Sequence, residues 1–183
     1  MVSTPLTASL KVTVHCSVAA FVGSPPMNLV EGTVEDGAIS FAGFHVPLGE
    51  RTDLSGHDGR TVIVGIRPSD LEDADVWTAS GATILDVEVD ITEELGSEVN
   101  LLFSVDAPPV TTEEALAAAS DEGADDILPL ITERAQFCAR VDARTRAKPG
   151  ERVRLAVDPT RFHFFEPETG LAISSDRTVS ATA

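Results

Sequence analysis

Few residues of this chain could do chemistry, and their spacing argues against the commonest phosphate reaction. A phosphate-binding loop of the glycine-rich type needs a lysine directly after a glycine, because that lysine meets the phosphates that the backbone cradles. The two lysines, Lys11 and Lys148, follow a leucine and an alanine instead. The sequence therefore excludes such a loop.

The histidines and cysteines do not form a metal or nucleophile pattern. None of His15, His45, His57 and His163 stands three or four positions from another ligand residue in a zinc arrangement. His15 and Cys16 are neighbours, but a nucleophile and its base need a third group that orients the base, and the sequence offers none. We interpret the four histidines as surface or edge residues.

The remaining catalytic signals are equally weak. No serine stands in a G-x-S-x-G elbow, and the 30 acidic residues make a close carboxylate pair expected by chance. Residues 54–58, LSGHD, resemble the start of the ABC-ATPase signature, but His57 and Asp58 replace its second glycine and its glutamine. We interpret that match as chance, and nothing in the sequence supports catalysis.

The composition limits the partners of the chain. With 183 residues, of which 43% are hydrophobic, it can form one domain or a compact pair of subdomains with a real core. A formal charge of −17 argues against nucleic acid and against an acidic membrane surface, since both are bound through clustered Lys and Arg. The acidity favours solubility, and docking of a basic partner is the alternative.

Cysteine usage and hydropathy predict a cytoplasmic location. Two distant cysteines, Cys16 and Cys138, make no disulfide framework. No apolar run approaches the roughly 20 residues that span a bilayer. Residues 1–21 do not form a signal peptide, because Lys11 and His15 interrupt the apolar stretch and no basic region precedes it.

The element that the sequence predicts most clearly is a buried strand over residues 61–66. Its β-branched run must stop at Arg67, because Pro68 lacks an N–H and disfavours helix in the preceding residue. Asp36-Gly37 is a strong hairpin signal, and residues 95–97 predict a second turn. Further short strands are predicted over residues 29–34, 38–44, 45–48, 82–92, 98–105, 136–141, 152–157, 162–165 and 171–173.

Between these strands the sequence predicts loops of different character. Residues 69–80 are expected to form a loop or one helical turn, with Trp77 covering an edge of the core, and residues 106–134 an acidic, partly helical insertion. Arg144, Arg146 and Lys148 form a basic loop. Many short strands joined by Gly, Pro and Asp turns are typical of a small barrel, so the fold class is mainly β, an OB-like β-barrel with two similar halves as an option.

Four motifs in order carry a resemblance to a known family: FVGSPPMN (21–28), GIRPSDL (65–71), ITEELGSE (91–98) and PGERVRLAVDPTRFHFFEPETGLAI (149–173). In this order and spacing the chain resembles, over residues 17–173, the C-terminal regulatory (TOBE) domain of sugar-importer ABC ATP-binding proteins of the maltose and glycerol-phosphate type. The family places an ATPase domain before the first motif. With only some twenty residues ahead of Phe21, the chain is expected to lack that domain, as an excised domain, a truncated gene product or a natural stand-alone form.

The resemblance implies a non-catalytic role in carbohydrate transport. Such domains contact each other in a homodimer, tether the ATPase subunits and receive regulatory proteins, within an ATPase/permease complex at the inner face of the membrane. No cofactor or metal is expected on this chain, because ATP and Mg belong to the ATPase domain. The alternative is a stand-alone module for a small ligand, an oxyanion or a sugar, for which the loop of residues 144–148 is the only basic cluster.

The resemblance also assigns residues and boundaries. Residues 1–28 are the lead-in and joint, 29–173 the regulatory domain and 174–183 a disordered tail. The interdomain joint would comprise Phe21, Gly23, Ser24, Pro25, Met27 and Asn28; the barrel rim Gly65, Arg67, Pro68, Glu93, Leu95 and Gly96; and the dimer face His163 and Phe165.

Overall fold

The computed structural model describes residues 13–14, 25–49, 54, 56–77, 82–112 and 134–173, with the backbone alone for residues 13–14 and 111–112. The strands are β1 Thr13–Val14, β2 Asn28–Glu35, β3 Ala38–Phe41, β4 Phe44–Pro47, β5 Thr61–Ile66, β6 Leu71–Asp73, β7 Thr83–Glu88, β8 Ile91–Glu94, β9 Glu98–Val105, β10 Thr111–Thr112, β11 Ala135–Asp142, β12 Arg152–Val157 and β13 His163–Phe165. Two short 3-10 helices, η2 (Pro68–Asp70) and η3 (Pro159–Arg161), join strands. The fold class is mainly β, as predicted.

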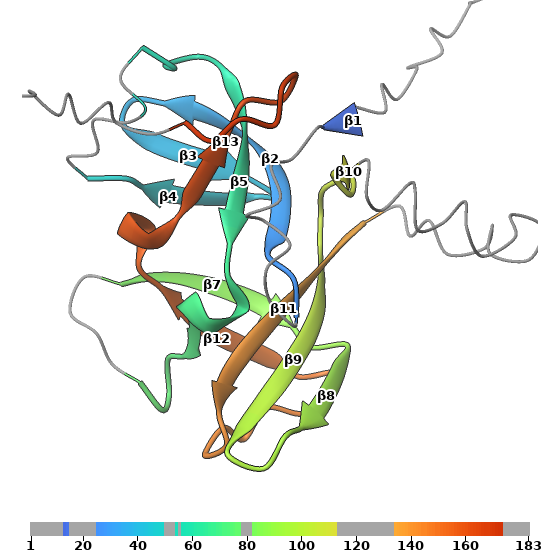
Figure 1. The fold of residues 1–183 in the computed structure, drawn as a ribbon. Helices are drawn as coiled ribbons and strands as arrows, with labels where there is room; N and C mark the ends of the chain where they lie inside the picture. The colour runs from blue at the N-terminus through green and yellow to red at the C-terminus, as the bar shows by residue number, and fades with distance from the viewer. Residues whose placement is uncertain are drawn as a thin grey trace, which may run out of the picture.

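Three antiparallel sheets make up most of the molecule. The first has the strand order β13-β5-β2-β3-β4 and lies in the upper part of Figure 1. The other two, β6-β12-β7 and β11-β9-β8, lie below it. In addition, β1 pairs in parallel with β10. Within the described ranges β5 is thus an inner strand of the largest sheet, between β2 and β13.

One hydrophobic core joins the three sheets. Its buried side chains come from strands of every sheet, for example Ile39 in β3, Phe137 in β11 and Leu155 in β12. Strand β5 is buried on both faces, because Val64 contributes to this main core while Ile63 contributes to a second, smaller cluster on the other face. The continuous apolar run that predicted a buried strand over residues 61–66 reflects this double burial.

The single strand predicted over residues 38–44 is wrong. The chain turns at Ala42 and Gly43, whose φ angles are 48° and 82°, and β3 pairs with β4 across this turn. Two consecutive residues with positive φ form the tight hairpin turn that matches the twist of the flanking strands. The predicted turn at Asp36-Gly37 is confirmed by the same signature, with φ angles of 51° and 74°.

The strand predicted over residues 82–92 is divided between two sheets. Its first half, β7, pairs with β12, and β8 pairs with β9 after a break at Val89. Leu85, Val87 and Val89 are buried, whereas Ile84 and Ile91 keep 39% and 52% of their surface exposed. The single strand predicted over residues 82–92 is therefore wrong, because the chain leaves the β6-β12-β7 sheet after β7 and continues as β8, the edge of the β11-β9-β8 sheet.

The stretch after β5 holds more regular structure than predicted. The predicted helical turn is η2, but a strand follows it directly, β6, which pairs with β12. Trp77 remains 40% exposed rather than covering the core. Most of the predicted insertion, residues 113–133, lies outside the described residues, as does the tail from residue 174.

Candidate functional site

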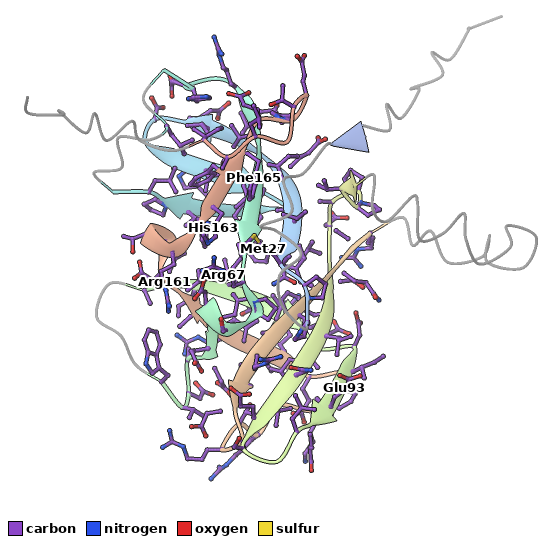
Figure 2. The ribbon with its side chains drawn as sticks, in the orientation of Figure 1. Met27, Arg67, Glu93, Arg161, His163 and Phe165 are labelled. Carbon is purple, nitrogen blue, oxygen red and sulfur yellow. The ribbon has the colours of Figure 1, made fainter. Side chains whose placement is uncertain are left out.

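The end of β5 brings together residues from three of the predicted sets. Gly65 pairs with Leu29 of β2 on one side and with His163 of β13 on the other. A Cβ atom added to Gly65 would touch the Met27 sulfur and would lie 2.9 Å from Cε2 of Phe165. Figure 2 shows Met27, His163 and Phe165 gathered around this strand. Glycine is required here because two side chains close over its backbone.

Phe165, a predicted dimer-face residue, is largely covered by its own chain. Its ring is 4% exposed and forms the second hydrophobic cluster with Ile63, with Met27, Leu29 and Val110 packed against it. His163 is half-buried on the same strand. The role of these two residues in a dimer stays a prediction.

Asn28, a predicted joint residue, connects two sheets of the same chain. Its side-chain Nδ2 donates to the backbone oxygen of Cys138 at 2.8 Å, and the Cys138 N–H donates to its Oδ1 at 2.7 Å. The amide therefore imitates the paired hydrogen bonds of a β-ladder between β2 and β11. Asn28 is 5% exposed and Cys138 is half-buried, so this clamp is partly buried.

The thiol of Cys138 is poorly suited to act as a nucleophile. Burial, and less strongly the negative charge of Glu93, raise the pKa of Cys138 to about 11, and Arg140 opposes them. Because the thiolate is the nucleophile, a thiol with this pKa is inert near neutral pH. Of the other predicted joint residues, Phe21, Gly23 and Ser24 lie outside the described residues, while Pro25 is half-buried.

The predicted rim residues fall into two separate places. Arg67 is exposed and precedes η2, in which Pro68 is buried. The Arg67 side chain makes no hydrogen bond or ion pair within the described ranges. Glu93 lies on β8, far from Arg67 in Figure 2, and its carboxylate accepts a hydrogen bond of 3.3 Å from Asn100. Leu95 and Gly96 form the β8–β9 turn, Leu95 with 53% exposure and Gly96 with φ 90°.

An ion pair that sequence reasoning missed joins the two short helices. Arg161 Nη1 of η3 lies 3.2 Å from Oδ1 of Asp70 in η2; the Asp70 side chain is 2% exposed and that of Arg161 is 60% exposed. Within the described residues the second oxygen, Oδ2, has no hydrogen-bond partner. The pair thus connects a buried carboxylate to a guanidinium at the surface.

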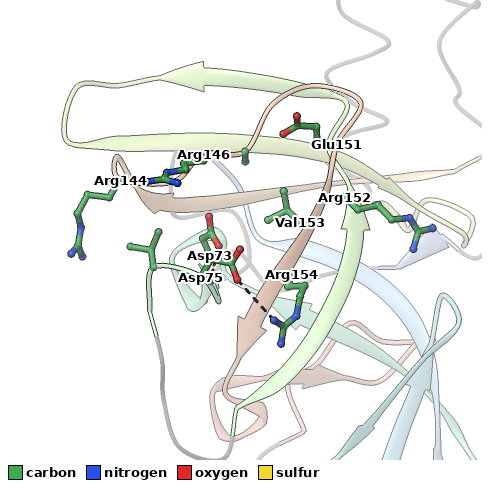
Figure 3. A pocket seen from close by; sticks show the side chains of 10 residues that line it. Asp73, Asp75, Arg144, Arg146, Glu151, Arg152, Val153 and Arg154 are labelled. Atoms are coloured by element: carbon green, nitrogen blue, oxygen red, sulfur yellow. Dashed lines mark hydrogen bonds and ion pairs between the residues drawn. The ribbon is translucent and has the colours of Figure 1, made fainter.

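The basic loop predicted from the sequence forms one wall of a pocket. This arginine pocket has a volume of about 600 Å³ and is shown in Figure 3. It is lined by Asp73, Asp75, Val76, Arg144, Arg146, Ala147, Glu151, Arg152, Val153 and Arg154. The sequence predicted Arg144 and Arg146 as part of a basic cluster. Arg152 and Arg154 line the same pocket, because alternate residues of β12 share one face.

Carboxylates compensate most of these arginines. Arg144 makes a bidentate contact with Asp142, with Nε 2.9 Å from Oδ1 and Nη2 3.1 Å from Oδ2. The hydrogen bonds from Arg144 lower the pKa of Asp142, and the same contact raises the pKa of Arg144. Both groups are therefore charged at neutral pH.

The described residues show no metal-binding group. Within these ranges no three His, Cys, Asp or Glu side chains come together as a metal-binding group. His57 Nε2 is 3.0 Å from Oε1 of Glu166, and His45 Nδ1 is 3.0 Å from the Ser40 hydroxyl, so each contact ties two segments at the molecular edge. The described part also holds no helix of the length and apolarity that crossing a membrane requires.

Comparison with known proteins bears directly on this architecture. Residues 23–71 match the family model of the MalK OB fold domain, which covers β2 to the start of β6 and includes Gly65 and Asn28. The OB-like fold predicted from the strand pattern is thus confirmed. Cytoplasmic molybdate-binding protein ModG, with molybdate bound, has a TM-score of 0.47 and 14% identity, covering 76% of this chain and 96% of that one. That likeness is too distant to carry an argument.

The curated relatives are sugar-import ATP-binding proteins. Oligosaccharides import ATP-binding protein MsmX of Bacillus subtilis is 30% identical over 161 residues, 85% of this chain and 37% of MsmX. Multiple sugar-binding transport ATP-binding protein MsmK of Streptococcus mutans is 32% identical over 163 residues, 85% and 36% respectively. Trehalose import ATP-binding protein SugC of Mycobacterium tuberculosis is 30% identical over 164 residues, 84% and 39%. The chain therefore spans less than two fifths of the length of these relatives.

The resemblance inferred from the four motifs is confirmed by these matches. The matched region extends over most of the chain, and it contains the OB fold that the family model identifies. The chain is similar to sugar-import ATP-binding proteins over most of its length, and its residues 23–71 match the MalK OB fold domain.

Proposed function

We propose that this chain is a non-catalytic regulatory and dimerisation domain for the ATP-binding subunit of a carbohydrate ABC importer. The observation that carries the proposal is the combined match: the MalK OB fold domain over residues 23–71, and sugar-import relatives over about 85% of the chain. In this role the domain holds two ATPase subunits together while they open and close, and it receives regulatory proteins.

The packing around β5 supports a tethering role. A tether must keep its shape while attached domains move, and shape is kept best where side chains are closely packed. Gly65 is covered by Met27 and Phe165, and the Asn28–Cys138 clamp joins two sheets. Residues 21–28, the predicted interdomain joint, lead directly into this rigid region.

Cellular location and cofactor use follow from the same proposal. The chain works in the cytoplasm and reaches the inner face of the membrane through the transporter complex. ATP and Mg are bound by the ATPase part of the complex, and this domain has no cofactor of its own. His163 belongs to the proposed dimer face, which Phe165 supports from the second hydrophobic cluster of its own chain, and Arg67 and Glu93 lie at two separate places on the rim.

A chimera tests the proposal. The part of MsmX that this chain matches is replaced by the whole chain, and transport and ATP hydrolysis are measured beside MsmX in which that part is deleted. We expect the chimera to dimerise and to transport more oligosaccharide than the deletion protein. A folded chimera that transports no better than the deletion protein would overturn the proposal.

The small-ligand alternative has one observation in its favour. The basic loop that the sequence singled out borders the arginine pocket of about 600 Å³. A ligand there is compatible with a regulatory domain as well as with a stand-alone module. The pocket is therefore argued on its own chemistry below.

A further inference from the structure

The arginine pocket is built from three segments that lie far apart in the sequence. Asp73 and Asp75 come from the end of β6 and the turn after it, Arg146 from the loop after β11, and Val153 and Arg154 from β12. A volume of about 600 Å³ lies within the range of roughly 300–1,000 Å³ that small-molecule sites occupy. The pocket is larger than a single inorganic anion needs.

Arg146 is the one arginine of this pocket without a partner in the described part of the chain. Arg144 contacts Asp142 and Arg152 contacts Asp86, at 2.9 Å and 3.1 Å. Figure 3 shows these two side chains extending away from the pocket in opposite directions. An unpaired guanidinium is notable in a chain with a formal charge of −17, where carboxylates are plentiful.

The loop that carries Arg146 is fixed in place on both sides of it. The Thr145 hydroxyl donates to Oδ2 of Asp73 at 2.5 Å and accepts a hydrogen bond of 3.2 Å from the Ala147 N–H. Ala147 also packs against the main core. A guanidinium on a fixed backbone loses less conformational freedom when it binds a ligand.

The carboxylates that line the pocket, those of Asp73, Asp75 and Glu151, form no ion pair with this arginine in the described part of the chain. Both oxygens of Asp73 accept hydrogen bonds from other groups, one from Thr145 and one from the Asp75 N–H. Asp75 lies 3.9 Å from Arg154, and both side chains are largely exposed, 81% and 60%. The guanidinium of Arg146 is therefore available to an anion.

We propose that this pocket binds a small metabolite that carries a phosphate group, with Arg146 as the phosphate ligand. A guanidinium presents a planar fork of donors that matches two oxygens of a terminal phosphate. The remaining volume holds the body of the metabolite. This inference does not depend on the role in a sugar importer.

Calorimetric titration of the full chain at low ionic strength tests the site with three probes: glucose 6-phosphate, inorganic phosphate and glucose. We expect saturable binding of glucose 6-phosphate, weaker binding of inorganic phosphate and no binding of glucose. Arg146→Met should weaken glucose 6-phosphate at least about tenfold, which corresponds to ~1.4 kcal/mol for one charge-assisted contact. Arg60→Met, which removes an exposed arginine outside the pocket, should bind as the wild type does.

Several results would overturn the site. These are no saturable binding by the wild type, equal binding by Arg146→Met, or binding of glucose as tight as that of its phosphate. Thermal unfolding checks that each variant is folded. If Arg146→Met does not fold, Arg146→Gln is measured in its place and should show the same selective loss of the phosphate probes, with unchanged binding contradicting the proposal.

Discussion

The end of β5 and the arginine pocket are built in opposite ways. Around β5 the interacting groups are apolar or neutral and buried, as in the Asn28–Cys138 clamp and the contacts over Gly65. In the pocket the interacting groups are charged, and most are exposed. From this difference we infer that the end of β5 maintains the shape of the domain. We expect substitutions of charged residues in the arginine pocket to leave the domain folded.

The largest effect on stability is expected at Asn28. Asn28→Leu leaves the partly buried N–H and C=O of Cys138 without their partners and should lower the free energy of unfolding by about 2–5 kcal/mol. Asn100→Leu is the matched control, because Asn100 is as buried but makes one longer hydrogen bond, to Glu93. Denaturant unfolding measures both. Equal losses in the two variants would show that the clamp adds no stability.

Gly65→Ala should cost less than the clamp variant. The added Cβ would overlap the Met27 sulfur and approach the Phe165 ring, which we expect to lower the free energy of unfolding by about 1–3 kcal/mol. Gly32→Ala is the control, since its Cβ would meet the Ile39 and Val64 side chains at 3.0 Å, a tight contact but less close than those over Gly65. Chemical denaturation compares the two, and a cost at Gly32 above that at Gly65 would argue against a closed contact over β5.

Thr145→Val tests the anchoring of the pocket loop, because Thr145 ties this loop to buried Asp73. Loss of this hydrogen bond should lower the free energy of unfolding by about 1–2 kcal/mol and should weaken glucose 6-phosphate binding. Thr160→Val, which removes a hydroxyl that donates to Asp158 at an exposed site, is the control. Thermal unfolding and calorimetry report the two effects. Stability and binding that both match the wild type would contradict the proposed anchoring of the loop.

The smallest effect is expected at Arg152. Arg152→Met removes an exposed ion pair with Asp86, and exposed pairs contribute from about 0 to 1 kcal/mol. We therefore expect an unfolding midpoint close to that of the wild type, measured by the same thermal scan. A loss as large as that of Gly65→Ala would mean that the charged region also maintains the shape of the domain.

Local patterns made much of the β5 region predictable. The apolar run of residues 61–66, the stop at Pro68 and the Asp36-Gly37 turn are each encoded in neighbouring residues, and the structure confirms them. The turn at Ala42-Gly43 was missed because alanine rarely adopts positive φ. The change of sheet at Val89 was missed because the alternation of residues 83–94 continues through it.

The contacts that define the two regions could not be read from local patterns. The Asn28 clamp joins residues 110 positions apart, and the Asp70–Arg161 pair likewise depends on how distant segments pack. One part of the pocket could be predicted, because polar and apolar residues alternate at the start of the predicted strand 152–157 and place Arg152 and Arg154 on one face. The sequence contains no signal that brings this face to the loop with Arg146.

The central claim, a tethering domain that pairs with a second copy of itself, is tested most directly by sedimentation velocity of the purified chain over a wide range of concentrations. The account predicts a reversible monomer–dimer equilibrium that shifts toward dimer as concentration rises. A chain that sediments as a monomer at the highest concentration reached would contradict it.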